Sequence, residues 1–190
     1  MRLKNKQFFA LKASLPYLKF GVRPFLSRSR FLEYCEAFLE EEELDFLKGL
    51  SLAVPEKLPE GDSCEAEYAG YETALRNAVA LVRAKKKGIR GDLFLRENTG
   101  KAADEDMSSL ITVLQNAPDP LEREKILDKA RWTRLEELEN AHYADLDALS
   151  IYCRKLLILE KWTQYQPDAA EKNLDNTVMA LEKAAEDRSV

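Results

Sequence analysis

His142 is the only histidine in the chain, and it is followed closely by Tyr143, Asp145 and Asp147. An imidazole beside carboxylates is the residue set that general-base catalysis or a metal ion would use. A metal site needs three or four convergent ligands, and no cysteine lies near this stretch of the sequence. We therefore expect His142 to be a capping or partly buried side chain, and an enzyme that depends on His142 is the less favoured hypothesis.

The three thiols form no recognisable chemical motif. Cys35, Cys64 and Cys153 are far apart in the sequence, and none belongs to a CxxC pair. Such spacing argues against a disulfide framework and against a zinc site, since both commonly use paired or clustered cysteines. We expect reduced thiols inside the core, where free cysteines are often found.

The sequence also lacks the glycine-rich loops that hold phosphate groups. Gly100 and Lys101 are followed by alanine, and Leu95 occupies the position of the first glycine of a nucleotide-binding loop. No GxGxxG stretch is present either. We therefore predict a non-catalytic protein with no catalytic residue, no cofactor, no metal and no small-molecule substrate.

A cationic cluster marks the end of a predicted helix at 65–87. Gly88 and Gly91 follow its last lysines, which is the ordinary arrangement at a helix C-terminus, where positive side chains meet the helix dipole. The same cluster could instead bind an acidic protein partner or a nucleic acid. The candidate protein-binding residues are Arg83, Lys85, Lys86, Lys87 and Arg90.

Charge is distributed unevenly along the chain, whose formal net charge is −5. Residues 1–30 contain eight Lys or Arg and no acidic residue, which leaves 21 cations against 34 acids, or −13, for the rest. A basic N-terminal segment on an acidic body can steer an acidic partner. We expect a protein surface rather than a nucleic acid, because an acidic body repels phosphates and the aromatic residues near the cluster are predicted to be core residues.

Composition predicts an all-α protein with a single domain over residues 1–190. Apolar residues make up 45% and charged residues 33%, with only seven Gly and seven Pro, which suits helices better than a sheet with many turns. After the N-terminal segment, every apolar run, including the one at 156–159, is far shorter than the roughly 20 residues of a bilayer span. We expect a cytoplasmic protein without direct membrane insertion, held peripherally at the inner face of a membrane through partner proteins.

Hydrophobic periodicity and capping residues predict a bundle of about six to eight helices. Ser27 or Ser29 is predicted to cap a helix at 31–39, and Asp119 is predicted to cap a helix that begins with Pro120. Further helices are predicted at 7–15, 44–50 and 65–87, and the short apolar element at 107–116 is of undecided type.

Residues 121–166 contain neither Gly nor Pro, and one unbroken helix of that length would reach roughly 70 Å. We predict a break at 140–147, capped by Asp145 or Asp147, which makes a long C-terminal helical hairpin. Its second arm, at 146–162, is apolar nearly all round and is predicted to be the central buried helix. A last amphipathic helix is predicted from the spacing of Leu174, Val178 and Leu181.

Three stretches carry a recognisable pattern: FFALKASLP at 8–16 with Phe20 after it, LRN at 75–77 leading to RAK at 83–85, and ARW at 130–132 followed by HY at 142–143 and LEKW at 159–162. The chain resembles, in these stretches, a bacterial family of uncharacterised proteins encoded beside V-type ATPase subunits. Lys12 departs from the pattern, where an apolar residue is expected.

That family is in turn similar to a shortened form of the V-type ATPase C subunit, an all-helical protein that joins the rotor stalk to the membrane ring. The resemblance implies a structural coupling or assembly role, with stalk or membrane-ring subunits as partners and no catalytic residue to carry over. It also implies two possible helical units, at 27–95 and 119–185. The alternative hypothesis is a free-standing helical adaptor that binds other proteins.

Overall fold

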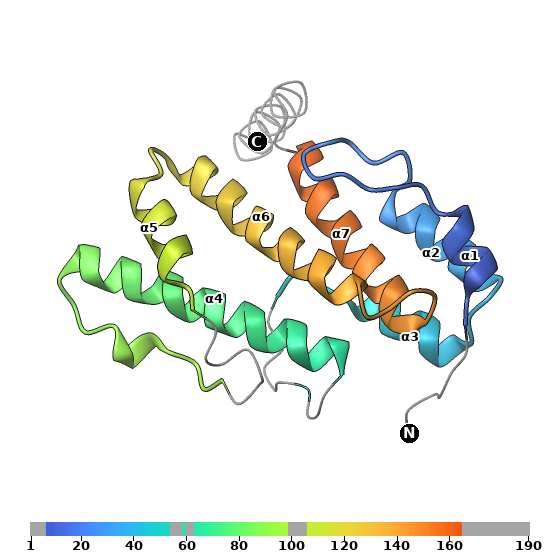
Figure 1. Ribbon diagram of the computed structural model, residues 1–190, viewed down its shortest axis with the longest axis horizontal. Helices are drawn as coiled ribbons and strands as arrows, with labels where there is room; N and C mark the ends of the chain where they lie inside the picture. The colour runs from blue at the N-terminus through green and yellow to red at the C-terminus, as the bar shows by residue number, and fades with distance from the viewer. Residues whose placement is uncertain (1–6, 54–58, 60–62, 99–105, 165–190) are drawn as a thin grey trace, which may run out of the picture.

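The structure is a computed structural model that describes residues 7–53, 59, 63–98 and 106–164. All regular secondary structure in these ranges is helical, which confirms the predicted all-α fold class. In chain order the elements are α1 (Phe9–Ser14), α2 (Arg28–Glu36), α3 (Glu41–Gly49), α4 (Cys64–Lys87), the 3-10 turn η1 (Asp92–Phe94), α5 (Ser108–Asn116), α6 (Pro120–Glu139) and α7 (Leu146–Gln164) (Figure 1).

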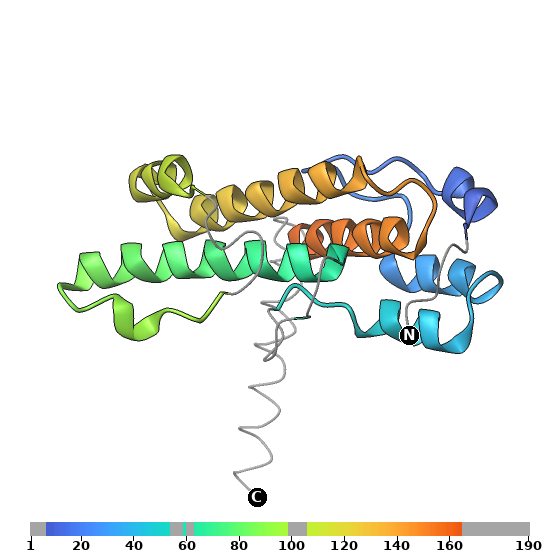
Figure 2. The ribbon, with the colours of Figure 1, turned by 60° about the horizontal axis from the view of Figure 1, so that its bottom comes forward.

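Helix α6 runs between two groups of helices (Figures 1 and 2). On one side it packs against α4 and α5, and α4 in turn contacts η1. On the other side it packs against α7, which also contacts α2 and α3. The candidate site lies in the first group, along the second half of α4.

Side-chain caps explain where several helices begin. The Ser27 hydroxyl accepts a hydrogen bond from the Arg30 amide (3.2 Å), and Ser63 does the same for Ala66 (3.2 Å) at the start of α4. Asp119 accepts from the Glu122 amide (2.8 Å), with Pro120 as the first residue of α6. These contacts satisfy amides that have no partner inside the helix, so the short polar residues fix the helix starts.

The main hydrophobic core surrounds α7, whose side chains are buried on almost every face, as the sequence predicts. The preceding helix ends at Glu139, and the Asp145 carboxylate caps α7 by accepting from the Ala148 amide (2.8 Å). The predicted last helix with Leu174, Val178 and Leu181, and the end of the predicted unit at 119–185, lie outside the described residues. The single-domain prediction for 1–190 therefore stays a prediction.

A second, smaller core forms where α4, α5 and α6 meet. It consists of Tyr71, Leu75, Leu114 and Leu127. The element at 107–116, undecided from the sequence, supplies one of these residues as helix α5. This core holds α4 against α5 and α6, and so it positions the helix that carries the cationic cluster.

Helix α2 is shorter than the sequence predicts. The predicted helix at 31–39 ends at Glu36, because the amides of Phe38 and Leu39 both turn back to the Cys35 carbonyl (2.9 and 3.0 Å).

Among the described helices, none is both long enough and apolar enough to cross a bilayer.

Candidate functional site

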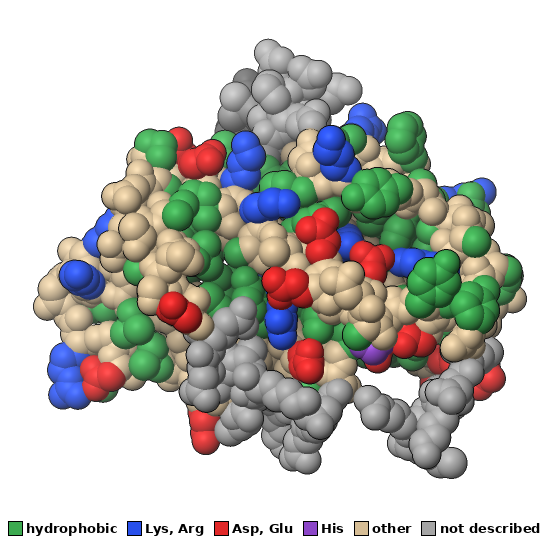
Figure 3. All heavy atoms as spheres, in the orientation of Figure 1, with side chains coloured by type: hydrophobic (Ala, Val, Ile, Leu, Met, Phe, Trp, Pro, Cys, Tyr) green, Lys and Arg blue, Asp and Glu red, His purple; other side chains and the backbone are tan. Residues whose placement is uncertain are grey.

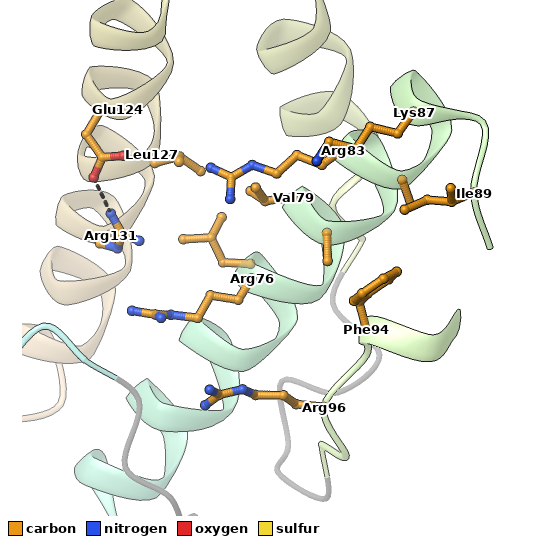
Figure 4. Close-up of a pocket in the computed structure, with 13 residues that line it drawn as sticks. Arg76, Val79, Arg83, Lys87, Ile89, Phe94, Arg96, Glu124, Leu127 and Arg131 are labelled. Carbon is orange, nitrogen blue, oxygen red and sulfur yellow. Dashed lines mark ion pairs between the residues drawn. The ribbon is translucent and has the colours of Figure 1, made fainter. Parts of the chain in front are cut away.

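An open groove of about 570 Å³ lies between the second half of α4, the following segment at 88–98 and α6. Its floor is apolar and its walls carry cations (Figure 4). The floor residues are Leu75, Val79, Ala80, Ala84 and Leu127, and the cationic residues are Arg76, Arg83, Lys87, Arg96 and Arg131. A groove of this volume is within the range that proteins use to bind other molecules.

Two of the five cations are neutralised by neighbours inside the protein. Arg131 donates to Glu72 (2.8 Å) and to Asp128 (2.6 Å), and Arg76 donates to the same Glu72 (2.8 Å). Glu124, the one acidic side chain among the lining residues, is itself ion-paired with Arg131 (3.5 Å) and with a lysine of α7. These contacts leave no carboxylate in the groove for the remaining cations.

The other three cations have no such neighbours. No described residue forms a hydrogen bond or an ion pair with the side chains of Arg83, Lys87 or Arg96. Figure 4 shows the guanidinium groups of Arg76, Arg83 and Arg96 extending in the direction of α6. The groove is therefore a site of surplus positive charge, and it suits an anionic ligand.

The far wall of the groove is the segment 88–98, which we call the strap. Gly88 ends α4 in the left-handed conformation (φ +67°) and reverses the chain. Gly91 then passes so close to α4 that an added Cβ would lie 2.8 Å from Leu81 Cδ2. Further along, the Asn77 side chain exchanges two hydrogen bonds with the Arg96 backbone (2.8 and 2.9 Å). The strap is thus fastened to α4, and this holds Arg96 at the groove.

The strap also exposes apolar side chains beside the cations. Phe94 lines the groove and is 56% exposed, and its neighbour Leu93 is 72% exposed. The aromatic residues earlier on α4, Tyr68 and Tyr71, are buried as predicted, whereas Phe94 is not a core residue. Exposed apolar side chains rimmed by charge are typical of surfaces that bind proteins.

The five candidate residues named from the sequence are only partly brought together. Arg83 and Lys87 both line the groove. Lys86 lines a smaller neighbouring cavity of about 130 Å³ between α4 and α6, and Lys85 lines neither. Arg90 is ion-paired with Asp92 on the strap. Four further groove residues were not predicted from the sequence, namely Arg76, Arg96, Arg131 and Phe94.

The cluster around His142 lies at the start of α7. His142 Nδ1 lies 2.7 Å from Asp145 Oδ2 and 3.7 Å from Asp147 Oδ2. The three side chains are close enough together to hold an ion, but the second oxygen of Asp145 already caps α7. The arrangement is that of a capped helix start with a partly buried imidazole, as the sequence predicts.

All three cysteines are free and buried. Burial raises the pKa of the Cys35 and Cys64 thiols to about 12, and it also raises the pKa of Cys153. Since the thiolate is the reactive form, buried thiols with raised pKa values are poor nucleophiles at neutral pH.

Comparison with known protein families, with curated proteins and with solved structures finds no match for this chain. The class of the protein is therefore defined by the structure alone. It is an all-helical protein with a cationic groove beside exposed apolar side chains.

Proposed function

We propose that this protein is a non-catalytic binding protein whose groove receives an acidic segment of a partner protein. One observation carries the proposal. Arg83, Lys87 and Arg96 line one groove without an acidic partner among the described residues, and the exposed ring of Phe94 lines the same groove. A partner segment with carboxylates on one side and apolar side chains on the other would satisfy both features.

Charge favours a protein partner over a nucleic acid. Beyond residue 30 the chain carries 21 cations against 34 acids, so a long phosphate backbone would meet repulsion outside the groove. A short acidic segment needs only the local surplus of charge. Guanidinium groups also bind carboxylates in a two-point geometry, which gives direction as well as attraction.

The specific partner we propose is a stalk or membrane-ring subunit of a V-type ATPase, with this chain as a coupling component or an assembly factor. Its support is the resemblance carried by the stretches at 8–16, 75–85 and 130–162. Two of these stretches contribute groove residues, Arg76 and Arg83 from the second and Arg131 from the third. A free-standing adaptor would use the same groove for a different acidic protein.

A photo-activated cross-linking residue in place of Phe94 tests the proposal in cells. We expect it to capture a V-type ATPase stalk or ring subunit, because the side chain at 94 faces the groove. The matched control places the same residue at Phe38, which is exposed on the turn between α2 and α3. Equal capture from both positions, or no capture from position 94, would reject the groove as the binding site. Reproducible capture of another acidic protein from position 94 would favour the free-standing adaptor.

A further inference from the structure

The loop between α1 and α2, residues 15–27, exposes apolar side chains that nothing in the described structure covers. Tyr17 is 86% exposed and Phe25 is 94% exposed, and Val22 between them is 48% exposed. Two aromatic rings displayed so fully are costly in water, since each presents a large apolar surface. None of the three residues lines any of the described cavities.

The exposure is not the result of a loosely attached loop. Leu18 and Leu26 are buried in the main core, and Phe20 packs edge-on against Trp132 with ring centroids 5.7 Å apart. The Tyr152 hydroxyl donates a hydrogen bond to the Pro16 carbonyl (2.9 Å). The loop is therefore anchored at both ends and near its tip, while Tyr17 and Phe25 project away from the core.

Cations alternate with the exposed apolar residues along this loop. Lys19 and Arg23 are exposed, and no acidic residue occurs in the sequence between residues 1 and 30. Lys129 of α6 adds a further cation, lying 5.2 Å from the ring of Phe20. Figure 3 shows hydrophobic side chains together with Lys and Arg side chains over the part of the molecule formed by α1 and this loop.

We propose that this loop binds the surface of an anionic lipid bilayer. Tyr17, Val22 and Phe25 enter the interfacial region, where aromatic side chains are preferred, and Lys19 and Arg23 contact lipid phosphates. Exposed side chains that line no described cavity suit a bilayer, which accepts them without a complementary shape. The contact is shallow, because none of the described helices can span a bilayer.

The acidic body does not prevent this contact. Charges more than about 8 Å from the bilayer surface are largely screened at physiological ionic strength, so the local cations of the loop decide the attraction. Binding through a few cations and three apolar side chains is weak and depends on salt. The inference does not rest on the groove, which lies on the other side of α6 around α4.

Sedimentation with phosphatidylcholine vesicles, with and without phosphatidylglycerol, tests the proposal. We expect the full chain to bind only the anionic vesicles, and Y17A/F25A to lower the bound fraction at limiting lipid by about tenfold. K19E/R23E should have the same effect. The control Y34A/F38A removes two exposed aromatic rings from α2 and the turn after it, and it should bind like the wild type.

Tryptophan fluorescence tests directly whether the loop contacts the lipid. The difference in emission between Phe25→Trp and the wild type, which contains Trp132 and Trp162, should shift to shorter wavelength when anionic vesicles are added and not with phosphatidylcholine alone. The variant Y17A/F25A keeps the basic residues before α1. If this variant binds anionic vesicles as well as the wild type does, those basic residues and not the loop bind the lipid, and the proposal is overturned. Absence of wild-type binding to anionic vesicles at low salt would also overturn it.

Discussion

Arg131 of α6 and Glu72 of α4, 59 residues apart in the sequence, form a buried two-point ion pair, with Nε to Oε2 at 2.8 Å and Nη2 to Oε1 at 3.0 Å. The same guanidinium binds Asp128, which is fully buried and accepts further hydrogen bonds from Lys161 (2.8 Å) and Trp162 Nε1 (2.9 Å) of α7. This ionic network joins α4, α6 and α7, and it forms one end of the groove.

We predict that Arg131→Met lowers the free energy of unfolding by about 3–5 kcal/mol, because it leaves the buried carboxylates of Glu72 and Asp128 without their main partner. Urea unfolding followed by circular dichroism measures the change. Lys125→Met is the control, since Lys125 is exposed on the same helix, and it should cost less than about 0.5 kcal/mol. Similar losses in both variants would show that the network contributes nothing specific.

Glu139 should make the protein sensitive to acid. Burial raises the pKa of this carboxyl, but hydrogen bonds from Lys12 and Lys155 and their positive charge outweigh burial, so the pKa lies below its ordinary value of 4.5. A lowered folded-state pKa stabilises the fold above the ordinary value, and the gain is lost as pH falls through the folded pKa.

We therefore expect Glu139→Gln to be less stable than the wild type at neutral pH, with the two unfolding free energies converging as pH falls below about 4.5. Urea unfolding at a series of pH values measures both curves. A constant difference between the two proteins from neutral to acidic pH would contradict the assignment of this acid sensitivity to Glu139.

The buried thiols should react slowly in the native protein. Because burial raises the pKa of Cys35 and Cys64 to about 12, few of these thiols are ionised at pH 8, and the core also blocks access to them. We expect labelling with an aromatic disulfide reagent to be slow for the native chain and complete within seconds in denaturant. Rapid labelling of a single cysteine in the native chain would indicate an accessible thiol.

His142→Ala should cost at most about 1–2 kcal/mol of stability, the scale of a lost helix cap, because Asp145 keeps its hydrogen bond to the Ala148 amide. Binding at the groove should be unchanged. Metal analysis of the purified wild type complements the stability measurement. Stoichiometric zinc that disappears in the variant would show that the cluster of His142, Asp145 and Asp147 is a metal site.

The helix starts and ends were readable from the sequence where one residue determines them. Asp119 caps its helix as predicted, because capping depends on neighbours two or three residues away. At two other helix starts the sequence offered a pair of candidates, and the caps are Ser27 and Asp145. Gly88 ends α4 for the same local reason. The element at 107–116 was undecided because a short apolar run fits both a helix and a strand.

Only some of the groove residues could be predicted from the sequence. Arg83 and Lys87 stand four residues apart on α4, and Arg76 lies earlier on the same helix, so helical spacing could have grouped them. Arg96 and Phe94 join them only because the strap folds back and Asn77 holds it. Such a contact between distant residues leaves no periodic signal in one sequence.

The groove itself is tested by charge reversal. The binding partner in this test is the stalk or ring protein that position 94 captures. We predict that R83E/K87E/R96E associates with it at least about tenfold more slowly than the wild type at low salt. The difference should shrink at high salt, where exposed charges are screened. The matched control K48E/K85E/K125E makes the same change in net charge outside the groove.

Binding of an acidic partner in the groove is therefore measured by the association rate of these two triple variants with that partner over a series of salt concentrations. We expect R83E/K87E/R96E to associate far more slowly than the wild type at low salt and at a rate closer to it at high salt, and K48E/K85E/K125E to associate at a nearly normal rate, with equal helix content in both. Association of the groove variant at the wild-type rate at every salt concentration would contradict binding of the partner in the groove.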